Sequence, residues 1–172
     1  FACAIIFGFQ TFTIEFLHLT ESQNSLLFTL FGIIGAISQI FLVGRVAKYL
    51  GLKKAFTTAI IFTAVSFIIM FFSKSVPVFV FASVILALFN GMTQTFIPTI
   101  LSNEVDAKSQ GTIMGLNASY QSIGMIFGPI VGGLLASIAV QLPFLIGFFV
   151  VVLCAYLSLH VLKPNVKKES AF

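Results

Sequence analysis

The chain has 172 residues, of which 59% are hydrophobic and only 8% are charged, whereas a typical soluble domain carries about 25% charged residues. Lys and Arg exceed Asp and Glu by 9 − 5 = 4, a basic excess too small and too dispersed to indicate nucleic-acid binding. A water-facing surface cannot be built from this composition. We therefore expect an all-α protein that crosses a membrane several times and lies in the lipid bilayer.

The cysteines and the first residues carry less information. Cys3 and Cys154 lie in apolar stretches near opposite ends of the sequence, which is typical of small hydrophobic residues rather than of a disulfide or a metal site. We expect no cofactor. The sequence starts at Phe1 with apolar residues and no basic stretch before them, unlike a secretory signal. We interpret it as a fragment whose true N-terminus is missing.

Polar separators and turn formers divide the chain into apolar segments, each near the length of about 20 residues that a helix needs to cross the bilayer. The predicted helices are 1–19, 25–43, 55–73, 76–101, 111–137 and 142–162. They would form a six-transmembrane-helix bundle over residues 1–163, followed by a tail at 164–172.

The cations are distributed unevenly over the predicted connections. If the chain crosses six times, Lys74 stands alone on one side, and on the other side lie Arg45, Lys48, Lys53, Lys54, Lys108, Lys163, Lys167 and Lys168. Lys and Arg in short loops stay with the cytoplasm. We therefore expect a multi-pass protein of the inner or plasma membrane with a cytoplasmic C-terminus.

Amide and carboxylate side chains are unevenly shared among the predicted helices. They occur in the first, second, fourth and fifth segments, while the interiors of the third and sixth have none. Because such groups are costly in hydrocarbon, the four segments are expected to line a polar space and the other two to face lipid. The members are Gln10, Glu15, Gln39, Asn90, Gln94, Asn117 and Gln121.

Two segments carry their polar residues as a stripe along one helical face. In 111–137 the stripe consists of Asn117, Tyr120, Gln121, Gly124 and Gly128. In 76–101 it consists of Asn90, Thr93, Gln94 and Ile97, followed by Pro98. With Gln10, the amides and the tyrosine of these stripes are candidates for lining a substrate cavity. The alternative is that the amides join helices to one another by hydrogen bonds.

Glu15 is the carboxylate that lies within a predicted membrane segment. Such a group could bind a cation or carry a proton, so Glu15 is a candidate ion or proton site. It also lies near the outer end of its segment, where an interfacial carboxylate solvated close to His18 is the competing interpretation.

Glycine and proline gather in the segment 111–137 as Gly124, Gly128, Pro129 and Gly132. Proline removes the amide that would bond back to Met125, which creates a point where the helix can bend. The glycines allow close backbone approach. A hinge and a static tight crossing would use the same residues. We favour the hinge because the predicted bend lies next to a helix face whose glycines have no side chains.

Three features of the sequence belong together. The stretch after the second segment contains Gly44, Arg45, Gly51, Lys53 and Lys54; residues 124–133 read Gly-Met-Ile-Phe-Gly-Pro-Ile-Val-Gly-Gly; and the Asn90-Gly91 step with Pro98 is followed by the polar loop 103–110 and then by Gly111 and Gly115. With these features the segments resemble the C-terminal half of a major facilitator superfamily transporter, most closely the twelve-helix drug:proton antiporter branch. The first feature is similar to the family's conserved cytoplasmic loop, although Lys48 and Tyr49 stand where the full motif has Asp and Arg. The second is similar to the antiporter signature, and the third is similar to helices ten and eleven.

The resemblance implies that the segments are helices seven to twelve, arranged as two inverted three-helix repeats. It implies a missing N-terminal six-helix half as partner, with the solute held between the halves. The implied function is alternating-access efflux of small amphipathic or lipophilic solutes, coupled to protons through carboxylates of the absent half.

Other functions are open to this composition. Importers of sugars and exporters of other metabolites share the architecture, and a non-transporting membrane scaffold or channel subunit is a further alternative. An enzyme is not expected, because Ser119, Ser122 and His160 lack the Gly-x-Ser motif and the depth of an intramembrane protease. Phosphate-binding, metalloprotease and paired-carboxylate motifs are absent from the sequence.

Overall fold

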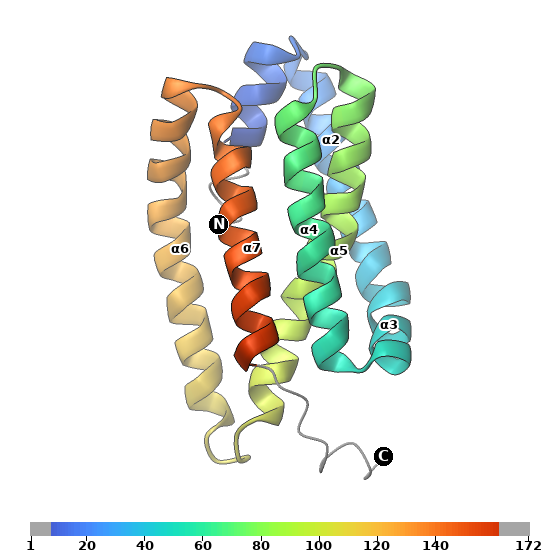
Figure 1. Ribbon diagram of the computed structural model, residues 1–172, viewed down its shortest axis with the longest axis vertical. Coiled ribbons are helices and arrows are strands. Elements are labelled where there is room, and N and C mark those ends of the chain that lie inside the picture. The colour runs from blue at the N-terminus through green and yellow to red at the C-terminus, as the bar shows by residue number, and fades with distance from the viewer. Residues whose placement is uncertain (1–7, 162–172) are drawn as a thin grey trace.

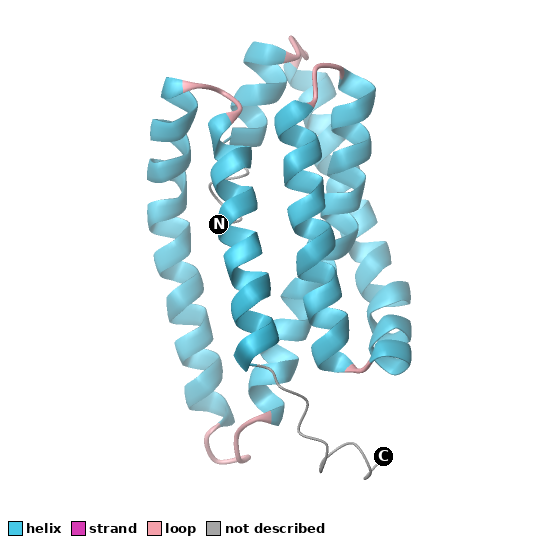
Figure 2. Cartoon of the chain, in the orientation of Figure 1, coloured by secondary structure: helices cyan, strands magenta, loops and turns pink. Residues whose placement is uncertain are grey.

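The computed structural model describes residues 8–161, and this part of the chain consists of helices joined by short turns (Figure 2). The prediction of an all-α fold is confirmed. The elements in chain order are the π-helix η1 (Phe12–Phe16), α2 (Glu21–Ile37), the π-helix η2 (Ser38–Leu42), α3 (Val43–Leu50), α4 (Leu52–Phe72), α5 (Val76–Asn103), α6 (Gln110–Ile138) and α7 (Leu142–Val161) (Figure 1).

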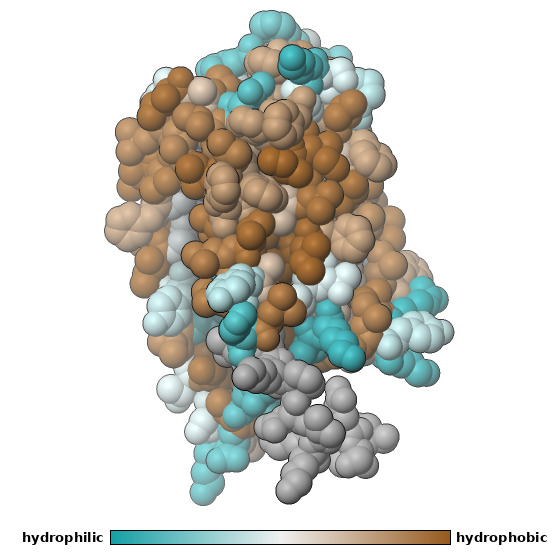
Figure 3. All heavy atoms as spheres, viewed as in Figure 1, coloured by the Kyte–Doolittle hydropathy of each residue, from teal (hydrophilic) through white to brown (hydrophobic). Residues whose placement is uncertain are grey.

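Five stretches of the described residues are long and apolar enough to cross a bilayer: Glu21–Leu50, Leu52–Phe72, Val76–Asn103, Gln110–Ile138 and Leu142–His160. The predicted first helix, 1–19, lies partly outside the described residues. Its described part is helical from residue 8 to the end of η1. Hydrophobic residues cover the middle of the face seen in Figure 3, and hydrophilic residues gather at its two ends, which is the pattern of a bilayer-spanning bundle.

The connection predicted at Gly44–Lys54 is wrong in form, because most of it is helical. The backbone runs from α2 through η2 into α3, and it breaks only at Gly51, whose φ of 77° is left-handed. Glycine adopts that conformation without a steric penalty. Basic residues at the membrane boundary are compatible with a helix, so charge marks the end of the apolar segment but not the end of the helix.

The predicted separator at residues 20–24 is also mostly helical. Thr20 caps α2: its side chain accepts a hydrogen bond from the Gln23 backbone, and the Gln23 side chain accepts one from the Thr20 backbone. This reciprocal pair is a capping box. Asn24 is buried in the first turn, where its side-chain oxygen accepts a 2.9 Å hydrogen bond from the Thr13 hydroxyl. These polar residues therefore start a helix and fasten it to the preceding one.

Two hydrophobic clusters hold the bundle together. The larger one is rich in phenylalanine and joins the first helical stretch to α4, α5 and α7; the Phe79 ring lies 4.9 Å from the rings of both Phe9 and Phe12. The smaller one, around Met92 and Phe96, joins α5 to the start of α4 and to α3. Part of the phenylalanine content thus serves helix packing.

Helix α6 stands at one edge of the bundle (Figure 1) and adds no residue to either cluster. Its buried residues are Gly128 and Gly132. Large apolar side chains of the same helix, including Ile126, Phe127 and Leu134, are exposed. The helix is therefore attached through its glycines and leaves most of its apolar surface uncovered by the described chain.

Candidate solute-binding surface

The predicted cavity residues of α5 lie at the edge of the smaller core cluster. Asn90 is half-buried and Gln94 is exposed, whereas Met92 and Phe96 on the neighbouring face are buried against α4. The helix continues past Pro98 to Asn103. Packing of the apolar face thus fixes the rotation of α5 and leaves the amide face at the surface of the bundle.

The predicted cavity residues of α6 have the same character. Asn117 is half-buried, the Tyr120 side chain is 68% exposed and Gln121 is exposed. Their helical spacing puts Asn117 and Gln121 on the face of α6 that carries Gly128. The polar stripe therefore lies on the same face as the buried glycines of α6, closer to the N-terminal end of the helix.

An apolar groove of about 250 Å³ lies between α6 and α7 on this same face. Three glycines, Gly124, Gly128 and Gly147, keep it open because they have no side chains to fill it. Its other lining residues are Ile123, Phe127, Val131, Leu135, Pro143, Ile146 and Val150. Along one face of α6 the surface thus changes from amide and phenol groups to an apolar hollow. Pro129 lies inside the continuous helix next to it.

The hydrogen bonds between helices are made by other side chains. The Ser38 hydroxyl donates to the Leu88 carbonyl oxygen over 2.6 Å, and the Thr57 and Ser158 hydroxyls are 3.0 Å apart. In residues 8–161 no side chain of the predicted cavity set bonds to another helix, and no buried side-chain nitrogen or oxygen lacks a partner. Hydroxyl groups, rather than the predicted amides, join the helices of this bundle.

The polar residues of the first two spans are exposed as well. Gln10 precedes η1 and Glu15 lies within it. Gln39 lies in η2, the turn between α2 and α3. Both π-helices thus contain a polar residue at the surface; such wide turns are uncommon and are frequent at functional sites.

The residues of the predicted loop motif occupy α3 and the first turn of α4. The Arg45 guanidinium donates to the Phe41 carbonyl oxygen over 3.0 Å. The Lys53 ammonium lies 2.9 Å from a Glu104 carboxylate oxygen, which links the start of α4 to the end of α5. Gly44 has open space beside it, Gly51 forms the break, and Lys54 is exposed.

One close approach was not predicted. A Cβ built on Gly91 of α5 would lie 3.2 Å from the carbonyl oxygen of Gly35 on α2. The small residues Gly32, Gly35 and Ala36 in the sequence signal a close crossing, but their partner helix becomes visible only in three dimensions.

The serine and histidine residues considered for chemistry are engaged within their own helices. The Ser119 and Ser122 hydroxyls donate to the carbonyl oxygens of Gly115 and Ala118, respectively. The Nδ1 atom of His160 lies 3.1 Å from the backbone carbonyl oxygen of Tyr156. Among the described residues, no three His, Cys, Asp or Glu side chains form a group that could hold a metal ion.

Within residues 8–161, five helical stretches of bilayer length, two of them with polar stripes at the bundle surface, define a polytopic membrane protein. The chain belongs to the Major Facilitator Superfamily, which its sequence matches over residues 1–172. The resemblance to this transporter family is thereby confirmed, and the chain falls outside the enzymes.

Three proteins to which the chain is similar are named as resistance proteins. Multidrug resistance protein 2 of Bacillus subtilis is 28% identical over 145 residues, 84% of this chain and 36% of the relative. Multidrug resistance protein 1 of the same organism is 30% identical over 129 residues, which are 73% of this chain and 32% of the relative. The class H tetracycline resistance protein of Pasteurella multocida is 26% identical over 155 residues, which are 87% of this chain and 38% of the relative. The chain thus spans about a third of the length of these relatives.

Proposed function

We propose that this chain is the C-terminal six-helix half of a proton-coupled exporter of small amphipathic or lipophilic solutes. Membership in the Major Facilitator Superfamily supports a transport function. The names of the relatives, which are multidrug and tetracycline resistance proteins, support drug-like solutes. In this proposal the six helices are two inverted three-helix repeats, and the N-terminal half closes the cavity.

The observation that carries the proposal is the polar stripe on bilayer-length helices. Asn90 and Gln94 of α5, with Asn117 and Gln121 of α6, have no side-chain bond to another helix of the described chain. An amide without a hydrogen-bond partner in hydrocarbon is strongly unfavourable. These side chains therefore need water, a solute or the other half as partner, and a water-filled cavity between two halves provides all three.

The two parts of this surface suit an amphipathic solute. The amides and the Tyr120 hydroxyl can donate or accept hydrogen bonds, while the groove between α6 and α7 offers an apolar wall of about 250 Å³. Neither part of this surface carries a charge, so it selects solutes by hydrogen bonding and by apolar contact. The charge that couples transport to protons then belongs to the absent half or to Glu15.

Alternating access needs a bundle that moves as a unit and a contact that can rearrange. We assign the moving contact to α6, because its buried residues are the glycines on either side of Pro129. The end of the bundle with α3 faces the cytoplasm in this proposal, since Arg45, Lys48, Lys53, Lys54 and Lys108 gather there and Lys74 lies at the opposite end (Figure 1). This orientation follows the positive-inside rule.

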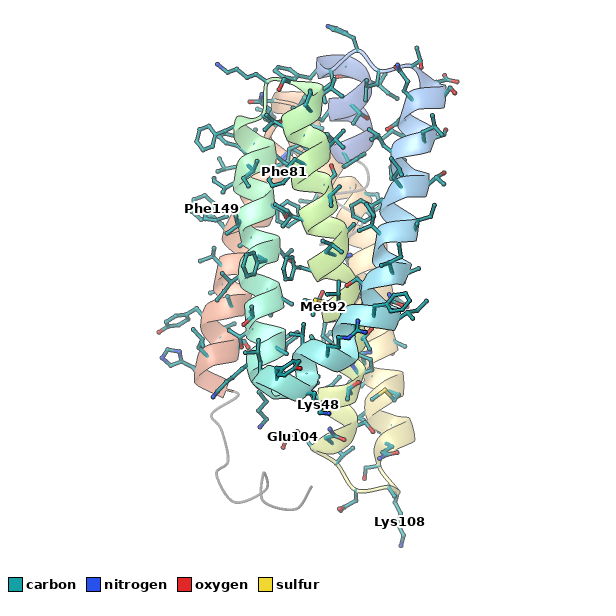
Figure 4. The ribbon with its side chains drawn as sticks, turned by 90° about the vertical axis from the view of Figure 1, so that its right-hand side faces the viewer. Lys48, Phe81, Met92, Glu104, Lys108 and Phe149 are labelled. Atoms are coloured by element: carbon teal, nitrogen blue, oxygen red, sulfur yellow. The ribbon has the colours of Figure 1, made fainter. Side chains whose placement is uncertain are left out.

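The test is cysteine accessibility in the full-length protein, with all its native cysteines, including Cys3 and Cys154, replaced by alanine. Single cysteines at Gln10, Asn90, Asn117 and Gln121 are expected to react with a membrane-impermeant thiol reagent, at rates that change when the exported drug is added. A cysteine at Phe149, an exposed residue of α7 (Figure 4), is the control and is expected to stay unreactive in lipid. Uniform protection of all positions would instead support a scaffold.

A further inference from the structure

Helix α3 is short and strongly two-sided. Val46 and Ala47 pack on the smaller core cluster, while Arg45 and Lys48 are exposed and Tyr49 is 84% exposed. Figure 4 shows α3 leaving the direction of α2 and running obliquely across the bundle toward the start of α4. The π-helix η2 at the change of direction provides the physical cause of the bend.

The length of α4 fixes the depth of α3 in the membrane. α4 has 21 residues, about 31 Å at 1.5 Å per residue, which matches the hydrocarbon thickness of about 30 Å. Lys53 and Lys54 lie in its first turn, and Lys74 is the second residue after its end at Phe72. Because only Gly51 separates α3 from α4, α3 lies at the boundary between headgroups and acyl chains.

The exposed side of α3 combines cations with apolar groups. Arg45, Lys48 and, at the start of α4, Lys54 provide positive charge, and Lys53 is engaged with Glu104. Tyr49 and Leu50 are exposed beside them. Of the carboxylates at this end, Glu104, the partner of Lys53, follows the last residue of α5 (Figure 4), and Asp106 lies in the turn between α5 and α6. Basic residues with aromatic and aliphatic neighbours are typical of interfacial helices that bind anionic lipids.

We propose that α3 is a lipid-binding helix at which Arg45, Lys48 and Lys54 bind the phosphate groups of anionic phospholipids. Tyr49 and Leu50 contact the upper acyl chains of the same leaflet. Charge complementarity selects the headgroup, and the exposed apolar residues select a lipid over a soluble phosphate. The inference requires only that the bundle spans a membrane, so it does not depend on the proposed export function or on which side is cytoplasmic.

The experiment uses the full-length protein in detergent with equimolar phosphatidylglycerol and phosphatidylcholine, and native mass spectrometry measures the lipid that is retained. The unchanged protein is expected to prefer phosphatidylglycerol. The variant Arg45→Gln/Lys48→Gln/Lys54→Gln is expected to lose at least about tenfold of this preference, because one cation near an anionic surface contributes about fivefold in binding.

A charge-conserving variant, Arg45→Lys/Lys48→Arg/Lys54→Arg, is the matched control and is expected to keep most of the preference. Lys108→Gln, which removes a cation from the turn between α5 and α6, is expected to leave it unchanged. If the triple glutamine variant is not monodisperse, Lys48→Gln alone is used, with an expected loss of about fivefold.

Three results would overturn the proposal. The first is full retention of the preference in a folded glutamine variant, and the second is an equal loss in Lys108→Gln. The third is displacement of phosphatidylglycerol by millimolar glycerol 1-phosphate, because that would indicate a site for soluble phosphate rather than for lipid.

Discussion

Gly91 of α5 faces the backbone of Gly35 of α2 so closely that a Cβ on Gly91 would lie 3.2 Å from the Gly35 carbonyl oxygen. One turn away, the Ser38 hydroxyl donates to the Leu88 carbonyl oxygen over 2.6 Å. The two contacts fasten α2 and the start of η2 to α5, next to the helix face that carries Asn90. This crossing sets the position of the predicted cavity wall, so its stability can be tested apart from transport.

Replacing Gly91 by valine is expected to destabilise the crossing. The added side chain meets the backbone of α2 rather than a flexible side chain, and overpacking of this kind costs about 1–3 kcal/mol. Thermal melting of the purified full-length protein should show a lower midpoint. Gly32→Val on α2 is the control, since nothing lies within 4 Å of a Cβ at that position. Equal midpoints for the two variants would contradict the close crossing.

The Thr57 and Ser158 hydroxyls, 3.0 Å apart in the bundle interior, are expected to be energetically coupled. Interhelical hydrogen bonds in membrane proteins contribute about 0.6 kcal/mol on average and up to about 1.7 kcal/mol. A double-mutant cycle with Thr57→Val and Ser158→Ala, measured by denaturant unfolding, should give a coupling energy in this range. The pair Thr57→Val and Ser83→Ala should be additive, because the Ser83 hydroxyl bonds to the Phe79 carbonyl of its own helix. Additivity in both cycles would refute the bond.

Gly128→Leu is expected to abolish transport while membrane insertion stays intact. Gly128 is one of the two buried residues of α6, so a leucine there pushes the helix away from the bundle and fills the groove. Gly133→Leu is the matched control on the same helix, with open space around its Cβ position. Drug export by cells and the amount of protein in the membrane are the two measurements. Normal export by the Gly128 variant would remove the role assigned to α6.

Gln121→Ala is expected to lower transport without lowering thermal stability. The side chain is exposed and makes no bond to another helix of the described chain, so its removal leaves the bundle packing unchanged but takes a hydrogen-bonding group from the proposed cavity wall. Ser119→Ala, on the opposite face of α6, should affect neither property, because the Ser119 hydroxyl bonds to its own helix. A fall in the melting midpoint of the Gln121 variant would indicate a structural role instead.

The sequence was informative where a single helix decides the outcome. Apolar length predicts the spans after residue 20, and the 3.6-residue period correctly groups Asn117, Gln121 and Gly128 on one face of α6. Hydropathy was misleading at α3, since Arg45 and Lys48 end the apolar segment while the helix continues to Leu50. The helix breaks at Gly51. Its left-handed φ, which the sequence does not show, reveals that this one residue forms the whole connection between α3 and α4.

Contacts between helices could not be predicted from the sequence. The bond from Thr13 to Asn24 and the contact of Gly91 with Gly35 depend on which faces meet, and that follows from the summed packing of all helices. Thr20 and Gln23 do carry a readable signal, the capping box, which predicts the start of α2 within the stretch interpreted as a separator. For the candidate site, helical spacing predicts which residues share a face, and their role in a cavity stays a prediction. The groove between α6 and α7 could not be predicted, because residues of two helices form it.

The slender attachment of α6 has a consequence for the biogenesis of the protein. A helix of 29 residues that is mostly apolar can enter the bilayer by itself, yet the described bundle holds it mainly through two glycines. Because Ile126, Phe127 and Leu134 are exposed, we expect a newly made chain to hold α6 in a fixed position only after another helix surface covers these side chains.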